Sequence, residues 1–142
     1  MTMMRAVRLH SAEGIDGLAI EDVAIPTLET TDALVRIHAA AITRDELEWP
    51  LDRRPAIPSY EVSGVVEAVG ADVTEVAADD PVFALTAFDR DGGASELAAV
   101  PAQLLVPKPR ALDHFESAAI PLAGLSAWQG LFTGNWRQAS AC

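Results

Sequence analysis

Histidine and cysteine, the ligands that zinc most often takes in proteins, are few and widely separated in this sequence. Its three histidines are His10, His38 and His114, and its only cysteine is Cys142. Zinc in proteins is held by four ligands, mostly thiolates and imidazoles, that converge on a tetrahedron. Three isolated histidines without clustered cysteines do not predict such a set, so we expect no metal site.

The sequence offers little support for a hydrolytic nucleophile or a dinucleotide site. Ser126 lies in the run Gly124-Leu125-Ser126-Ala127-Trp128, which lacks the final glycine of a nucleophile elbow and follows a predicted helix rather than a strand. None of the nine glycines forms a Gly-x-Gly pattern, the turn that lets a backbone approach a pyrophosphate. We therefore expect neither hydrolysis nor a complete dinucleotide site.

Size and charge narrow the class of protein further. The 142 residues suit one domain, and 50% apolar with 22% charged residues is a globular balance. The formal charge of −11 argues against nucleic acid, whose binding depends on Lys and Arg contacts to phosphates, and against an anionic membrane surface. No run approaches the roughly 20 apolar residues of a membrane span. A single cysteine forms no intramolecular disulfide, and we expect a cytoplasmic protein.

Short β-strands dominate the elements that must position any site. Valines at 62, 65, 66 and 69 make residues 59–70 the most continuous β-branched run, so we place that strand in the middle of a sheet. Many short strands separated by Gly and Pro favour a sandwich or barrel. The expected strands cover residues 4–9, 18–23, 33–42, 59–70, 82–86, 94–100 and 104–106.

Two capping patterns and one proline predict three helices. Thr43 and Glu46 have the spacing of a capping box, in which the Thr43 hydroxyl accepts the Glu46 amide proton. This predicts a short helix that ends before residue 50. Asp113 and Glu116 repeat the pattern for a helix to about residue 120.

The third helix is expected over residues 122–132, with Pro121 in its first turn. Large apolar side chains occupy nearly all its sides, as is typical of a buried helix. These residues are Leu122, Leu125, Trp128, Leu131 and Phe132.

Several motifs, taken in order, resemble the N-terminal GroES-like domain of the medium-chain dehydrogenase/reductase superfamily, in its zinc-independent quinone-oxidoreductase-like branch. The resemblance covers about residues 4–132. It implies a mainly β (α+β) fold, a partly open GroES-like β-barrel with short helices, over residues 1–132, followed by a polar tail over 133–142. The motifs are VRIHAAAITRD (35–45), IPSYEVSGVVEAVG (57–70), VFAL (82–85), GGASE (92–96), PKP (107–109) and AAIPLAGLSAW (118–128).

The resemblance implies an NADPH-dependent reductase that transfers hydride to a quinone, an enone or an aldehyde, with the dinucleotide carried by a Rossmann domain. Because no Gly-x-Gly is present, we expect the cofactor domain to be absent and this chain alone not to bind NADPH. One hypothesis is therefore a fragment, or one half of a split reductase. The alternative is a non-catalytic, stand-alone β-barrel that serves as a binding or interaction module.

The resemblance also implies roles for three residues. Thr43 stands where quinone reductases carry an asparagine that touches the nicotinamide side of the cofactor; the alternative is the helix cap above. Tyr60 replaces a histidine that binds zinc in other relatives, and its phenol could donate a proton to a substrate carbonyl, the alternative being packing. Ser126 matches a Thr or Ser near the cofactor.

Two departures from the family pattern have physical consequences. The family has Gly-Asp-Arg-Val where this chain has Asp79-Asp80-Pro81-Val82, and a lost glycine there costs on the order of 1 kcal/mol if the turn is kept. In the family the last helix leads into the Rossmann domain. Without that domain we expect the helix to leave an apolar face open. Such a face predicts a homo-oligomer or a cofactor-domain partner bound through this helix.

Overall fold

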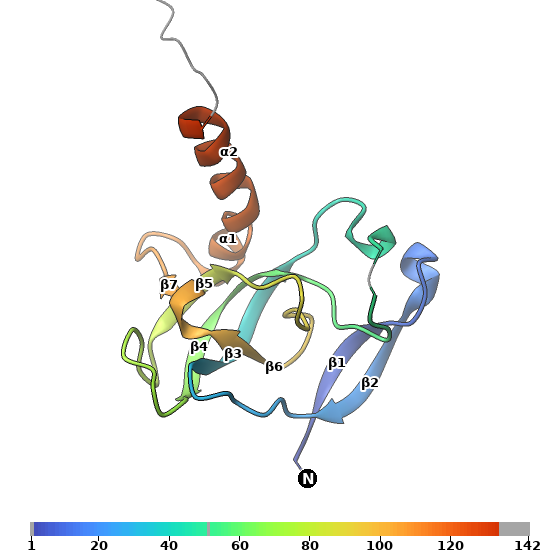
Figure 1. Cartoon of the computed structure of the whole chain (residues 1–142), viewed down its shortest axis with the longest axis horizontal. Coiled ribbons are helices and arrows are strands. Elements are labelled where there is room, and N and C mark those ends of the chain that lie inside the picture. Colours follow the sequence, from blue (N-terminus) through green and yellow to red (C-terminus); the bar gives the residue numbers. More distant parts are fainter. Residues whose placement is uncertain (1, 51, 134–142) are drawn as a thin grey trace, which may run out of the picture.

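The computed structural model describes residues 2–50 and 52–133, and its strands form two antiparallel sheets (Figure 1). The smaller sheet pairs β1 (Met3–Leu9) with β2 (Leu18–Ala24). The larger runs in the order β6–β3–β4–β5–β7, with β3 (Asp32–Ala41), β4 (Glu61–Val69), β5 (Pro81–Leu85), β6 (Leu97–Pro101) and β7 (Val106–Pro107). The helices are the 3-10 turns η1 (Gly14–Gly17), η2 (Glu46–Glu48) and η3 (Ala102–Leu104), and the α-helices α1 (His114–Ala118) and α2 (Pro121–Thr133). The mainly β prediction is confirmed.

The larger sheet provides the main core. β4 lies between β3 and β5, which confirms the central position predicted for residues 59–70. The bridges Ala6↔Ser95 and Leu9↔Ala56 join the small sheet to the segments that lead into β6 and β4 of the larger sheet. Small and β-branched side chains fill the main core: Ala33, Val35, Val62, Val66, Val82, Ala84, Ala98, Val100 and Leu105.

One glycine in β4 is required by the strand packing. A Cβ added to Gly64 would lie 2.1 Å from the carbonyl oxygen of Arg36 on β3. The register between β3 and β4 shifts between Ile37 and Ala39, close to this contact. The absence of a side chain therefore lets the two central strands approach where their register changes.

The short helix predicted after Thr43 forms and ends before residue 50, but it is a 3-10 turn rather than an α-helix. The chain forms only the 3-10 turn η2, because Asp45 takes a left-handed conformation (φ 63°) that interrupts a helix before it starts. Half of the capping box exists, since the Thr43 amide donates to Glu46 Oε2 at 2.9 Å. The Thr43 hydroxyl, however, donates to Glu61 at 3.3 Å instead of accepting from the Glu46 amide.

Two predicted strands begin later than the sequence indicated. In the run 94–100, Ala94 accepts from the Val7 amide at 2.8 Å and Ser95 bridges to Ala6, so these residues pair with β1 before β6 starts at Leu97. In the run 104–106, the 3-10 turn η3 takes up Leu104. In both places a contact distant in sequence or a turn competes with local strand propensity.

The two α-helices confirm their predictions and differ in burial. α1 has the full Asp113–Glu116 capping box. α2 projects away from the barrel (Figure 1), and its large side chains are mostly exposed, Trp128 at 62% and Phe132 at 66%. The expected open apolar face is therefore present. The polar tail was predicted over residues 133–142. α2 takes up Thr133, and residues 134–142 lie outside the described residues.

A buried ion pair fixes the loop after β5 to the start of β3. Asp32 is 2% exposed, and both its carboxylate oxygens accept from Arg90 Nη1, at 2.9 and 3.0 Å. Glu29 adds a second ion pair to the same guanidinium at 3.0 Å. These two acids raise the pKa of Arg90, Asp32 being the main cause. Removing Arg90 would leave the buried Asp32 carboxylate without its counter-ion, so this pair holds the loop to the start of β3.

The turn before β5 retains a glycine-like conformation without glycine. Asp79 has φ 72°, and its amide donates to the Val66 carbonyl at 2.8 Å. The neighbouring Asp80 carbonyl accepts from the Val66 amide at 3.0 Å. The backbone bonds to β4 therefore hold Asp79 in the left-handed region, as expected if the turn is kept.

We predict that Asp79→Gly raises the free energy of unfolding by about 0.5 kcal/mol. Relief of a left-handed side-chain conformation is worth roughly 1 kcal/mol, and the greater chain entropy of glycine in the unfolded state offsets part of it. Asp79→Ala is the matched control, because it removes the same carboxylate but keeps a Cβ. Urea denaturation measures both variants, and an equal gain in both would show that charge, not backbone strain, is responsible.

Candidate functional site

Thr43 lies in the loop after β3, on the wall of a cavity of about 320 Å³. Its hydroxyl donates to Glu61 Oε2 at 3.3 Å, and its amide donates to Glu46 Oε2. Because the one hydroxyl hydrogen is engaged by Glu61, the oxygen has only lone pairs left for a ligand. At this site Thr43 can therefore accept a hydrogen bond. The cavity is lined by Gly14, Ile15 and residues 42–48.

Glu46 is a buried carboxylate at the centre of this loop, with 3% of its surface exposed. Besides the Thr43 amide it accepts from the amide of Ser59, which is held at φ 72°. Burial raises the pKa of Glu46, and the negative charge of Glu61 adds to the increase. The two backbone hydrogen bonds work in the opposite direction without cancelling it. The pair thus ties the loop after β3 to the residues just before β4.

Tyr60 is 2% exposed and lies inside an aromatic cluster. Its ring stacks on Trp49 at 6.1 Å and meets Phe88 edge-on at 5.1 Å. Its hydroxyl accepts from Arg53 Nη2 at 3.3 Å. This environment favours the packing alternative for Tyr60, and its role as a proton donor stays a prediction.

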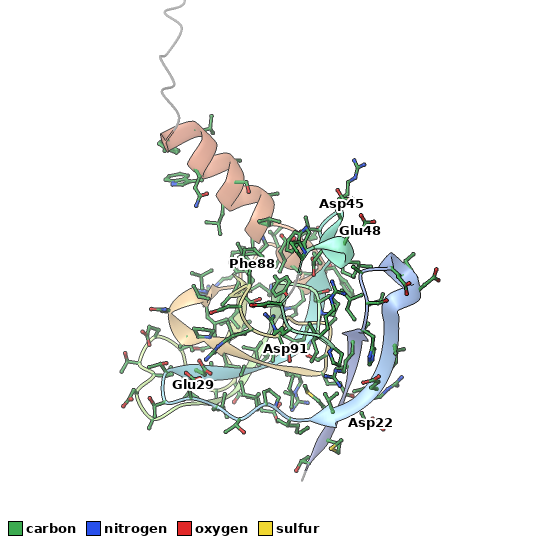
Figure 2. All side chains as sticks on the ribbon, turned by 45° about the vertical axis from the view of Figure 1, so that its right-hand side comes forward. Asp22, Glu29, Asp45, Glu48, Phe88 and Asp91 are labelled. Carbon is green, nitrogen blue, oxygen red and sulfur yellow. The ribbon has the colours of Figure 1, made fainter. Side chains whose placement is uncertain are left out.

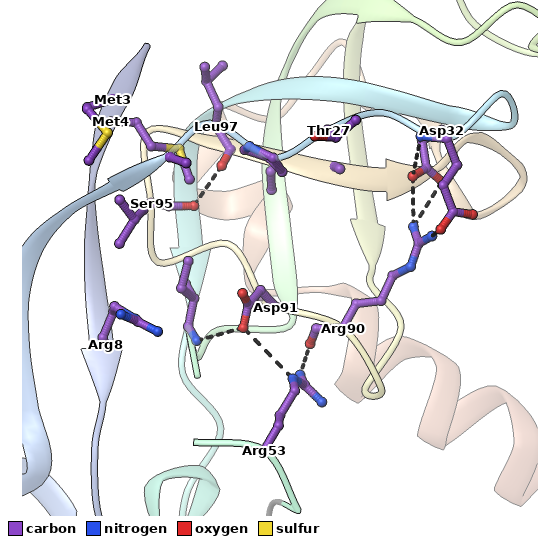
Figure 3. Close-up of a pocket in the computed structure, with 18 of the residues that line it drawn as sticks. Met3, Met4, Arg8, Thr27, Asp32, Arg53, Arg90, Asp91, Ser95 and Leu97 are labelled. Atoms are coloured by element: carbon purple, nitrogen blue, oxygen red, sulfur yellow. Dashed lines mark hydrogen bonds and ion pairs between the residues drawn. The ribbon is translucent and has the colours of Figure 1, made fainter. Parts of the chain in front are cut away.

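A second, larger cavity of about 730 Å³ lies between the β1–β2 hairpin and the loop after β5 (Figure 3). Arg53 reaches along it, donating to the Arg90 carbonyl, with its Nε 3.9 Å from Asp91 Oδ1. Arg90 turns the other way, to Asp32 (Figure 3). None of the three predicted site residues lines this cavity, so it is separate from the Thr43 site.

Ser126 is not brought to the other predicted site residues. It lies on the exposed part of α2, whose side chains extend beyond the barrel (Figure 2). The link between α2 and Thr43 is instead made by Glu61, which accepts from the Leu122 amide at 2.9 Å. The sequence did not single out Glu61 or the site role of Glu46. Only the presence of Glu46 in the capping pattern gave a local signal.

The histidines are less scattered than the sequence suggested. His38 of β3 and His114 of α1 stack with ring centroids 4.5 Å apart. The Ser63 hydroxyl donates to the Val82 carbonyl at 3.1 Å and also shares a hydrogen bond of 2.7 Å with His114 Nδ1. Burial lowers the pKa of His114, and the nearby His38 and Lys108 lower it further, against Asp113. No local pattern predicts this pair, because its members belong to distant segments.

Within residues 2–50 and 52–133, no group of three or more His, Cys, Asp or Glu side chains could hold a metal ion. Over the same residues, no helix is long and apolar enough to cross a membrane.

Comparisons with known proteins agree on one family. The alcohol dehydrogenase GroES-like domain matches residues 29–110. The chain is 29% identical over 140 residues to a chloroplast envelope quinone oxidoreductase homolog of Arabidopsis thaliana, covering 91% of this chain and 42% of that protein. It is 33% identical over 142 residues to 2-methylene-furan-3-one reductase of Solanum lycopersicum, covering 90% and 37%.

A solved structure shows the same fold. The quinone oxidoreductase from Coxiella burnetii superposes with a TM-score of 0.89 at 23% identity, over 97% of this chain and 47% of that one. The chain thus spans less than half the length of each of these relatives.

We predict that Glu46 makes the chain less stable as pH rises above about 4.5, the ordinary pKa of its carboxyl. Above that value the unfolded chain releases a proton that the folded chain still holds, so ∂ΔG of unfolding/∂pH from this group is negative. Glu46→Gln removes this contribution. The stability of the wild type minus that of the variant, from urea denaturation between pH 4 and 7, should therefore fall as pH rises. A flat difference would contradict the raised pKa.

Proposed function

The chain belongs to the alcohol dehydrogenase GroES-like domain family, and on this premise we propose that it is the substrate-side domain of a zinc-independent, NADPH-dependent oxidoreductase. The reaction class is hydride transfer to a quinone, an enone or an aldehyde. The names of the relatives from Arabidopsis and tomato, a quinone oxidoreductase homolog and a furanone reductase, support this substrate range. The phenol of Tyr60, where other relatives carry a zinc-binding histidine, supports chemistry without zinc.

The observation that carries the proposal is the state of Thr43. Thr43 lines the cavity, and its hydroxyl hydrogen is donated to Glu61, so its oxygen is left as an acceptor. This acceptor suits the N–H₂ group of a nicotinamide carboxamide. When bound, NADPH supplies the hydride. The proposed contact is to the nicotinamide edge only, because the sequence has no Gly-x-Gly turn for the pyrophosphate.

Tyr60 is the proposed proton donor to the reduced carbonyl. Arg53 can only donate, so the phenol hydrogen is not used in their hydrogen bond. A guanidinium at the phenol oxygen also stabilises the anion that proton transfer leaves behind. Access requires that Trp49 or Phe88 move, because the side chain is buried beneath them. Ser126, on α2, is proposed to approach the cofactor only once a cofactor-binding domain packs there.

The alternative function is a non-catalytic interaction module. The open apolar side of α2 favours it, because an exposed surface of this kind marks a site of protein association. Both functions share this surface. They differ in whether the Thr43 site takes part in chemistry.

We predict that this chain alone shows no saturable binding of NADPH at micromolar concentrations, measured by cofactor fluorescence.

A chimera should restore function, with this chain replacing the matching segment of the Coxiella burnetii quinone oxidoreductase. We expect it to reduce at least one quinone, enone or aldehyde with NADPH. In the chimera, Thr43→Val should raise the KM for NADPH about fivefold, because one hydrogen bond is lost. Thr43→Ser keeps the hydroxyl and should leave the KM unchanged.

Two results would overturn this proposal. Saturable micromolar binding by the chain alone would show that NADPH needs no Gly-x-Gly turn to bind here. A folded chimera that binds NADPH but reduces no substrate of the three classes would favour the interaction module.

We also predict that α2 mediates association of the chain. Sizing chromatography should give an apparent mass above 15.0 kDa that rises with concentration. Replacing Trp128 and Phe132 together with Ser should shift the protein to the monomer, because these side chains form the exposed apolar end of α2. Phe115→Ser is the matched control, since Phe115 is 76% exposed on α1. A wild-type monomer at every concentration would contradict the prediction.

A further inference from the structure

Glu61 joins two parts of the molecule that the sequence separates widely. It is the first residue of β4 and is 6% exposed. Oε1 accepts from the Leu122 amide at 2.9 Å, and Oε2 accepts from the Thr43 hydroxyl at 3.3 Å. No basic side chain among the described residues forms an ion pair with it. Hydrogen bonds from Thr43 and from α2 therefore take the place of a counter-ion.

The start of α2 depends on this carboxylate because the local sequence cannot cap the helix. The residues just before Pro121 are Ala119 and Ile120, neither of which has a side-chain acceptor. The first amides of a helix have no partner within it, and a carboxylate there also interacts favourably with the helix dipole. Glu61 supplies from β4 what an Asp or Ser cap supplies locally elsewhere. α1 shows the contrast, since it is capped by its own Asp113.

The same carboxylate determines what Thr43 can do. An ionised carboxylate only accepts, so it draws the hydroxyl hydrogen inward and turns the lone pairs of the oxygen away from itself. If Glu61 were a neutral amide, its N–H₂ could donate to Thr43 instead. The hydroxyl hydrogen would then be free to point outward, and Thr43 would present a donor to its ligand.

We propose that Glu61 is the positioning residue of the site: one carboxylate fixes the start of α2 and keeps Thr43 as an acceptor. The importance of that acceptor rests on the proposed function. The coupling itself is a property of this chain and does not require NADPH. It adds to the reaction a residue that touches neither cofactor nor substrate but orients a group that does.

The test is amide hydrogen exchange and NMR on the full chain carrying Glu61→Ala or Glu61→Gln. Glu67→Gln is the matched control, because Glu67 lies on the same strand and loses the same charge but is exposed and bonded to Arg36. Urea denaturation of each variant allows exchange rates to be corrected for global stability. In Glu61→Ala we expect the Leu122 and Gly124 amides to exchange about fivefold faster than in the wild type, the effect of a lost helix cap.

Glu61→Gln separates the two functions and is the variant to use if Glu61→Ala does not fold. Its amide oxygen can still accept from Leu122, so α2 should keep its protection while the Thr43 hydroxyl reorients. The Thr43 amide and methyl resonances should then move, whereas Glu67→Gln should leave them in place.

Two outcomes would overturn the proposal. One is wild-type protection of the first turn of α2 in Glu61→Ala after the stability correction. The other is Thr43 resonances that move equally in Glu61→Gln and Glu67→Gln. Failure of the chimera to reduce its substrates would count against the proposed function and leave these measurements unaffected.

Discussion

The site depends on two buried carboxylates that are stabilised by hydrogen-bond donors rather than by cations. Glu46 takes backbone amides from Thr43 and Ser59, and Glu61 takes the Thr43 hydroxyl and the Leu122 amide. Buried charge is costly unless each oxygen finds a donor. The donors to these carboxylates come from the loop after β3, the segment at the start of β4 and the start of α2, which therefore lie together. The fold holds the site because the carboxylates require these three segments together.

This requirement explains why one capping pattern was a reliable guide and another was not. Asp113 and Glu116 lie on an exposed surface where nothing competes for their side chains, and the local pattern decided the structure. Thr43 and Glu46 have similar chemistry but lie beside Glu61. The Thr43 hydroxyl donates to the buried Glu61 carboxylate. A buried carboxylate without a donor costs more free energy than a helix end that water can reach. Local signals therefore predict local structure best where no buried charge is close.

The same reasoning separates what the sequence could predict from what it could not. Alternation and β-branched runs located the strands, and the family resemblance located Thr43 and Tyr60. Neither shows bonding partners, because these come from the pairing of strands distant in sequence. Arg90 with Asp32, and His38 with His114, are further examples. The strained turn at Asp79 was predictable from the family's glycine at that position, whereas the backbone bonds to Val66 of β4 that hold it could not be read from the sequence.

The exposed side of α2 is the surface on which a partner of the Thr43 site would pack. No residue of the main core lies on α2. α2 exposes Trp128 and Phe132 while its first turn is bound to Glu61, one hydrogen bond away from Thr43. A body that covers α2 is thereby placed beside the cavity at Thr43, where the proposed cofactor still lacks a pyrophosphate site. One partner surface can therefore cover the apolar side of α2 and also supply the pyrophosphate site, because Glu61 fixes the direction in which α2 leaves the barrel.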